Sequence, residues 1–233
     1  MSTGGEPVGA VVQRTKAATT TQATSLTTTL GSNVTTGNLL IALITVTSGS
    51  SGITMPGGWT QRASDTAQTC NTFIYDHTTT STTDKSLVLT LPAGGAVVYL
   101  IEAAGLIGFD VTSKTDSASS ASTYTVSVTP TTASSYVIGF TSFNTAAVTT
   151  SFSGSSGTVL VDETAQTGST SATFHDAYGE SNTTQKTSVA VTVTTTAAVG
   201  YYELIAAVYK ASTAAPARQS IIIGQAVNRS YTY

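Results

Sequence analysis

Four apolar, strand-like segments follow one another in the first half of the chain, and four comparable segments return in the same order in the second half. SSYVIGFTSFN takes the place of GNLLIALITVT, and GTVLVDETAQTGSTSATFHDAY takes the place of GGWTQRASDTAQTCNTFIYDH. QKTSVAVTVTTTAAVGYYELIAAVYK then takes the place of TDKSLVLTLPAGGAVVYLIEAAG. The offset between the halves drifts from about 98 to about 103 residues, as small loop insertions would produce. We interpret this order as an internal duplication, and the shared Thr-Ala-Gln-Thr after Asp65 and Glu163 as its most visible remnant.

The composition of the chain indicates that the repeated segments are strands. Charged residues make up 9% of the 233 residues, whereas an average soluble domain has roughly 25%. Thr is the most frequent residue and Val is common, and these side chains favour the half-buried surface of a strand over disorder. A helix over AVVYLIEAAGLIG is the alternative at one segment, but its Val-Val-Tyr-Leu-Ile start favours a strand.

A sheet with one apolar face must bury that face against another layer. We therefore predict an all-β fold, an antiparallel β-sandwich (jelly-roll-like) over residues 34–212, built from pseudo-repeats at about 34–110 and 130–212. Each half would supply one sheet of four or five strands, related by a pseudo-two-fold axis. GNLLIALITVT reads as a strand buried on both faces.

Extended arms are expected on both sides of this sandwich. Residues 1–33 read as an N-terminal arm with one edge strand, AVVQRTK, and residues 213–233 follow a Pro-bearing linker as a C-terminal attachment tail. The tail would pair either with its own domain or with a neighbour's sheet edge. The candidate assembly residues in it are Ile221, Ile222, Ile223, Arg229, Tyr231 and Tyr233.

Charge and cysteine content exclude several classes of partner. The net charge is -3 and nine Lys and Arg are scattered along the chain, which argues against nucleic-acid binding. A single cysteine allows no internal disulfide framework. The start of the chain lacks a secretory signal pattern, and the longest apolar runs are too short for membrane insertion. A protein made in the cytoplasm without an export signal but composed like an extracellular one fits a phage virion, which leaves the host cell by lysis.

The order GNLLIALIT, ITMPGGWT, FIYDH, LVLTLPAGGAVVYLIEAAGL, YVIGFTSF and YYELIAAVY resembles a β-sandwich domain of phage tail and virion proteins and of some secreted bacterial proteins. In that family a GDLLVA strand, a GWT turn, an aromatic strand and an EYSGL-like strand end follow one another. Here IEAAGL lacks the Tyr of that ending. The ending GQAVNRSYTY is similar to C-termini of small structural proteins, minor tail or decoration proteins, of actinobacterial phages. The resemblance covers about residues 35–212 and implies a virion role without catalysis.

The sequence offers little material for catalysis. Asp76-His77 and His175-Asp176 lie at nearly matching places in the two halves, but neighbours on a strand point to opposite faces. Each pair could therefore contribute only one group to a given site, and we expect no catalytic, cofactor-binding or metal-binding residue and no cofactor. Glu102, within an otherwise apolar strand, is expected at a strand end or in hydrogen bonds rather than in catalysis.

Trp59, after a Pro-Gly-Gly turn, and Tyr75 are the candidate glycan contacts, since sugar sites use exposed aromatic faces. The alternative for Trp59 is that it plugs one end of the sandwich core.

The leading hypothesis is a non-enzymatic bacteriophage virion protein, a minor tail or capsid decoration protein that contributes to host-surface attachment, located in the virion. Its expected partners are other virion proteins, further copies of itself and a cell-surface glycan. The alternative is a carbohydrate-binding module of a secreted or surface bacterial protein.

Overall fold

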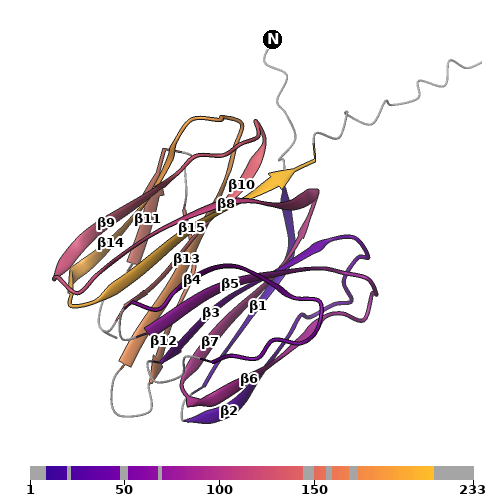
Figure 1. The fold of residues 1–233 in the computed structure, drawn as a ribbon, viewed down its shortest axis with the longest axis horizontal. Helices are drawn as coiled ribbons and strands as arrows, with labels where there is room; N and C mark the ends of the chain where they lie inside the picture. The colour runs from indigo at the N-terminus through magenta and orange to yellow at the C-terminus, as the bar shows by residue number, and fades with distance from the viewer. Residues whose placement is uncertain are drawn as a thin grey trace, which may run out of the picture.

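The computed structural model describes residues 9–19, 22–47, 52–67, 70–143, 150–155, 159–167 and 173–212. All regular structure in these residues is β, and every strand pair is antiparallel, which confirms the predicted fold class (Figure 1). The first half contains β1 (Ala10–Ala18), β2 (Ala23–Thr29), β3 (Leu39–Thr47), β4 (Thr60–Asp65), β5 (Cys70–Thr78), β6 (Ser86–Gly94) and β7 (Ala96–Ala104). The second half contains β8 (Leu106–Ser117), β9 (Ala121–Val128), β10 (Ser135–Phe143), β11 (Thr150–Gly154), β12 (Val159–Thr167), β13 (Thr173–Thr183), β14 (Val189–Val199) and β15 (Tyr202–Ala211).

The two halves share one topology. In the first half a five-stranded sheet has the order β1-β7-β3-β5-β4 and a small sheet pairs β2 with β6. In the second half the orders are β8-β15-β10-β13-β12 and β9-β14-β11, so that β8 corresponds to β1 and β15 to β7. The counterpart of β11 in the first half is the single bridge from Thr54 to Thr90 of β6. This placement of the first strand beside the last, with alternate crossings between two sheets, is jelly-roll-like.

Irregularities in the sheets recur at matching places and fix the alignment of the halves. The pairing of β4 with β5 is bulged at Arg62, and the pairing of β12 with β13 is bulged at Val161. The pairing of β1 with β7 is bulged at Val12, and that of β8 with β15 at Asp110. Because bulges are specific features of a fold, their recurrence in equivalent strand pairs supports the duplication independently of sequence.

The molecule has four layers. The small β2–β6 sheet lies against one face of the first five-stranded sheet, and the β9–β14–β11 sheet lies against one face of the second (Figure 1). The two five-stranded sheets pack on each other through their remaining faces. The prediction that each half supplies only one sheet of a single sandwich is therefore wrong in its layer count, because each half is already a two-sheet sandwich. The expected face-to-face packing of the large sheets is present.

Residues expected in the N-terminal arm form part of the first sandwich. β1 contains AVVQRTK and is the edge strand of the first large sheet, as predicted for that segment. β2 pairs with β6 along its length. A boundary between arm and sandwich at residue 34 would therefore separate β1 and β2 from the sheets to which they belong. The outward side chains of β2 are mostly Thr and Ser, which left its strand pattern unrecognised. Residues 1–8 and the predicted tail, 213–233, lie outside the described residues.

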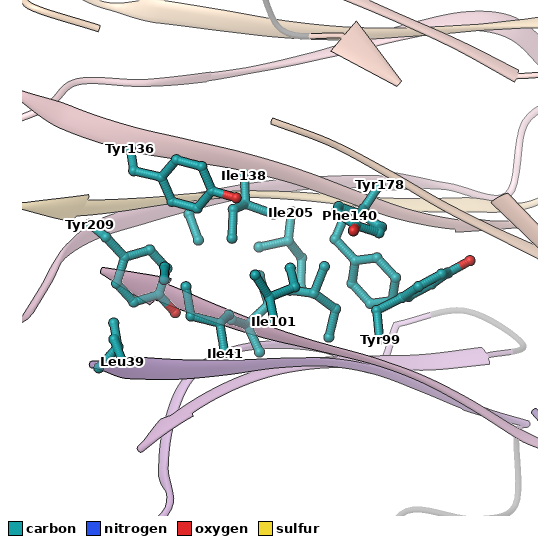
Figure 2. Packing of buried hydrophobic residues seen from close by; sticks show 14 of the residues in the cluster. Leu39, Ile41, Tyr99, Ile101, Tyr136, Ile138, Phe140, Tyr178, Ile205 and Tyr209 are labelled. Atoms are coloured by element: carbon teal, nitrogen blue, oxygen red, sulfur yellow. The ribbon is translucent and has the colours of Figure 1, made fainter. Parts of the chain in front are cut away.

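The central core joins the two sandwiches. Leu39 and Ile41 of β3 and Ile101 of β7 meet Tyr136 and Ile138 of β10 between the large sheets (Figure 2). The neighbouring residues of β3 point the other way, into the core of the first sandwich. β3 is consequently buried along its whole length, and so is β10, which confirms the strand predicted to be buried on both faces. The described residues include no helix that could cross a membrane.

Candidate functional site

Trp59 lies at one end of the first sandwich, where its turn leads into β4. Its ring stacks on the imidazole of His77, with centroids 5.5 Å apart, and packs half-buried against the core between β2–β6 and the large sheet. The turn requires glycine at position 58, which has a φ of 90° and lies against the His77 ring. The structure thus combines both interpretations of Trp59, because one side of the ring helps to close the core and the residue remains partly exposed.

His77 links the Trp59 turn to the loop that follows β5. Its Nδ1 lies 3.0 Å from the carbonyl oxygen of Gly58, and its Nε2 lies 3.8 Å from Oδ2 of Asp84. That carboxylate accepts hydrogen bonds from the backbone N–H groups of Thr80 and Ser81, both at 2.9 Å. These two backbone donors are the main reason that the pKa of Asp84 is lowered. This corner is therefore a hydrogen-bonded surface turn with one aromatic side chain partly accessible.

Tyr75, the second candidate glycan contact, is buried. It points from β5 to the same side of the sheet as Trp59, within the core of the first sandwich. Its hydroxyl donates a hydrogen bond of 2.7 Å to Oε1 of Gln61, and burial raises the pKa of the phenol. The structure brings Trp59 and Tyr75 to one face, but the Tyr75 ring is not displayed as a stacking surface.

The two His–Asp pairs are not equivalent in the structure. Asp76 pairs with Thr60, and Thr60 lies two residues before the Arg62 bulge. In the same way Glu180 pairs with Val159, and Val159 lies two residues before the Val161 bulge. Asp76 is therefore matched by Glu180 of β13 and not by the His175-Asp176 pair. His175 instead stacks on Phe143 at 5.1 Å, while His77 stacks on Trp59. The expectation that the two pairs occupy matching positions is wrong.

The matched acids Asp76 and Glu180 occupy similar surroundings, which sequence reasoning missed. Asp76 accepts a 2.8 Å hydrogen bond from Nε of Arg62, and its charge adds to burial in raising the pKa of Tyr209. Glu180 forms an ion pair of 2.8 Å with Arg14, and the Tyr136 hydroxyl donates a hydrogen bond to its other oxygen. Burial by itself would lower the pKa of Arg14, but the Glu180 carboxylate and the nearby Tyr178 and Tyr136 side chains together outweigh burial, so the pKa is raised. Each large sheet therefore has one carboxylate beside an arginine and a buried tyrosine at the central interface.

Further polar contacts join the two sandwiches at this interface. Nζ of Lys114 on β8 lies 3.1 Å from the buried Oδ1 of Asp65 on β4. Thr72 on β5 donates a hydrogen bond of 3.0 Å to Oε2 of the buried Glu203 on β15. Tyr99 on β7 donates one of 2.9 Å to the backbone carbonyl of Asp176. These contacts fix the mutual orientation of the sheets, since hydrogen bonds are directional and apolar packing is not.

Cys70 is buried beside these polar groups. Burial raises the pKa of its thiol well above the usual value, and the nearby Glu203 carboxylate adds to the effect. Such a cysteine stays protonated at neutral pH and is a poor nucleophile. Nor do the described His, Cys, Asp and Glu residues form a group of three or more that could hold a metal ion.

Glu102 has the hydrogen-bonded role that the sequence favoured. It is buried on β7, and its Oε1 accepts hydrogen bonds from Thr35 N at 2.8 Å and from Asn38 Nδ2 at 2.6 Å. Its Oε2 accepts a 2.7 Å bond from Gln13 Nε2. Burial by itself would raise the pKa of Glu102, but these donors outweigh it and the pKa is lowered. The carboxylate anchors the connection between β2 and β3.

The remaining predicted residues, Ile221, Ile222, Ile223, Arg229, Tyr231 and Tyr233, lie outside the described residues. In comparisons with known proteins, no family model, no curated protein and no solved structure matches this chain.

Proposed function

We propose that this chain is a non-enzymatic structural protein of a bacteriophage virion, a minor tail protein or a capsid decoration protein. The observation that carries the proposal is the continuous apolar core between the two large sheets, which makes one block from two duplicated sandwiches. Its burial of large aromatic and β-branched side chains stabilises the fold without a disulfide. A virion protein needs such stability after it has left the cell.

The outermost layers support the same proposal through their surface chemistry. On the outer face of the β9–β14–β11 sheet, Thr125 lies 2.8 Å from Thr192 across the strands, and Thr123 lies 3.5 Å from Thr194, measured between hydroxyl oxygens. On the other small sheet the hydroxyls of Thr29 and Ser86 are 3.0 Å apart. Cross-strand hydroxyl pairs stabilise sheets without charges whose interaction would vary with pH and salt. Such faces suit a particle exposed to changing surroundings.

The two ends of the described body lie together, which suits attachment at one end. Gly9 lies so near Leu106 that a Cβ atom at position 9 would be 2.8 Å from Cδ2 of Leu106, and Ser212 N donates a hydrogen bond of 2.6 Å to the carbonyl oxygen of Gly105. Figure 1 shows the start of β1 and the end of β15 at the same end of the molecule. Segments that continue from this end can contact a particle while the hydroxyl-covered faces remain exposed.

The test is to detect the protein on purified phage particles by quantitative mass spectrometry and immunogold labelling. We expect stoichiometric amounts in intact particles, at a few copies for a tail-tip component and at hundreds for capsid decoration. Labelling would place the protein on the tail or on the capsid. Recovery of the protein only in the lysate, with none on washed particles, would contradict the proposal.

Glycan binding at Trp59 is the second candidate function, and the observation that favours it is the partly exposed indole stacked on His77, whose Nε2 lies 3.8 Å from the Asp84 carboxylate, an acceptor for sugar hydroxyls. A glycan array of the native protein against the variant Trp59→Ala would test it, with Tyr201→Ala, a partly exposed aromatic at another position, as the matched control. Loss of signal in Trp59→Ala alone supports a glycan site at this corner. Equal signals from all three proteins would exclude it.

A further inference from the structure

The outer edges of the large sheets are protected against the addition of another strand. β1 has Arg14 and Lys16 on its exposed positions and is bulged at Val12. β4 is short and bulged at Arg62, and β8 has Lys114 together with irregular pairing to β15. Charged side chains and bulges are the usual means by which an edge strand avoids pairing with another chain.

Strand β9, at the edge of the second small sheet, has no charged residue, and its one register shift with β14 lies near its start, between Ala121 and Thr123. Its sequence, ASTYTVSV, lacks charge and proline, and it pairs with β14 without interruption from Val128 to Thr123. Within the described residues, the backbone–backbone hydrogen bonds of β9 are those of its ladder with β14, and the Ser122 carbonyl oxygen also accepts a hydrogen bond from Oγ1 of Thr195 on β14. One side of β9 therefore presents a regular row of backbone donors and acceptors, which can pair with an extended segment.

Apolar surface lies beside this edge. Tyr202 and Val111, both partly buried, pack against the core of the second sandwich. The Tyr202 ring stacks on Tyr124 of β9 with centroids 3.9 Å apart. A strand added next to β9 would place every second side chain over this side of the core. The edge thus fits a segment with β-branched apolar residues and no charge.

The chain itself contains such a segment beyond the described body. Residues 219–225 read QSIIIGQ, with Ile221, Ile222 and Ile223 in succession and no charged residue. Six residues, 213–218, connect this segment to Ser212 and can span at most about 20 Å. β15 ends beside Ser134, since Ala211 N donates to its carbonyl oxygen, and β9 ends a few residues before Ser134. An added antiparallel strand would start at the end of β9, and β15, the last described strand, ends near the residues that follow β9.

We propose that residues 219–225 of one copy add as an antiparallel strand to β9 of a second copy. The choice of a second copy as donor rests on the proposed function, because a virion component is repeated on its particle. Pairing brings together an uncharged edge and an uncharged segment, and places isoleucine side chains against Tyr202 and Val111. Repetition of this contact joins neighbouring copies on the particle surface.

Disulfide cross-linking between two differently tagged full-length chains tests this proposal. One chain carries Thr125→Cys on β9, and the other carries a single cysteine in place of Ile221, Ile222 or Ile223, so that both alternations of the donated strand are sampled. After mild oxidation we expect a cross-linked heterodimer with at least one of the three donors. The matched control places the acceptor cysteine on the protected edge instead, as Lys16→Cys. Native Cys70 is buried. Samples in which only one of the two chains has an introduced cysteine measure how much cross-linking arises from Cys70.

A heterodimer formed several-fold more with Thr125→Cys than with Lys16→Cys supports the proposal. Equal yields from both acceptors, or no heterodimer with any donor, would overturn it. A chain carrying Thr125→Cys and a donor cysteine together distinguishes the source of the strand. If dilute samples of this chain cross-link only internally, the segment pairs with its own β9 and the proposal is wrong. Cross-linking uses purified protein, so its failure is distinct from absence of the protein on particles.

Discussion

Gly139 shows how closely single residues are packed in this fold. It lies in the middle of β10, where a Cβ atom would lie 2.5 Å from Cγ1 of Val191 and 3.1 Å from Cε1 of Phe152. The small sheet approaches the large one at this point because position 139 has no side chain. The strand pattern of SSYVIGFTSF predicted a buried strand, but the sequence alone does not indicate which residue faces it from β14.

We expect Gly139→Ala to lower the free energy of unfolding by about 1–3 kcal/mol, the usual cost of overpacking a buried site. The matched control is Gly31→Ala, because a Cβ there meets nothing within 4 Å. Urea denaturation followed by circular dichroism measures both variants. Equal stabilities of Gly139→Ala and Gly31→Ala would contradict this prediction. They would show that the small sheet moves away from β10 at position 139 without loss of unfolding free energy.

The Cys70 thiol gives a second prediction, about reactivity. Because burial and then the Glu203 carboxylate raise its pKa, the thiolate is scarce even at pH 8, and the side chain is also inaccessible. We expect no reaction of the native protein with Ellman's reagent at pH 8 within an hour, and one thiol per chain in denaturant. The variant Ser127→Cys, with its cysteine on the exposed face of β9, is the control and should react at once. Rapid labelling of Cys70 in the native protein would contradict its placement.

Bulges show why the echo of Asp65-Thr-Ala-Gln-Thr in Glu163-Thr-Ala-Gln-Thr identified a real duplication but aligned it wrongly. Asp65 lies three residues beyond the Arg62 bulge, and Thr164 lies three beyond the Val161 bulge, so these two are equivalent and Glu163 is one position off. A shift by one residue exchanges the two faces of a strand. Local identity in a threonine-rich chain cannot detect such a shift, because threonine is accepted on either face.

The small sheets were the part of the fold that the sequence did not reveal as separate layers. Long apolar runs such as those of β3 and β10 were predicted correctly, since burial on both faces leaves a continuous hydrophobic pattern. β2 has one face in solvent and few large apolar residues, so its pattern resembled that of an extended arm. Among the candidate sites, Glu102 was foreseen as hydrogen-bonded, whereas the Arg14–Glu180 contact joins residues too distant in sequence to be paired by inspection.

The connection between β2 and β3 depends on Glu102, and this dependence predicts a pH effect. The folded state lowers the pKa of this carboxyl, so its contribution to stability is complete above the unfolded pKa, roughly 4.3, and is lost as pH falls through the folded pKa. We expect Glu102→Gln to reduce the free energy of unfolding by about 1.5–3 kcal/mol at pH 7, the range for hydrogen bonds to a charged acceptor.

Stability of the native protein and of Glu102→Gln is compared by urea denaturation at pH 7, 5 and 3. The difference should be similar at pH 7 and 5 and smaller at pH 3. The matched comparison is Glu180→Gln, a second hydrogen-bonded carboxylate, which lies at the central interface beside Arg14 and not at the connection between β2 and β3. A difference that grows as the pH falls would mean that the Glu102 carboxyl is bound in its protonated form.

The molecule as a whole behaves as two duplicated sandwiches that share one core. Each large sheet has apolar residues on both faces, one set for its own small sheet and one for the other half. Separation of the halves would expose the central set to water, at roughly 25 cal/mol for each Å² of apolar surface. Neither half can unfold without removing the cover of the other, so unfolding should be cooperative across the chain.

The single tryptophan makes this coupling measurable. Trp59 reports on the first sandwich, whereas Leu204 is buried in the core of the second, between β15 and the small sheet. Leu204→Ala should cost about 2–5 kcal/mol, as for other buried leucines. Because the sandwiches share their central core, we expect the Trp59 fluorescence transition to move to lower temperature by several degrees and to coincide with the loss of β-structure by circular dichroism. Leu87→Ala, within the first sandwich itself, provides the reference shift. If Leu204→Ala leaves the Trp59 transition unchanged while part of the circular dichroism signal is lost earlier, the two sandwiches unfold independently.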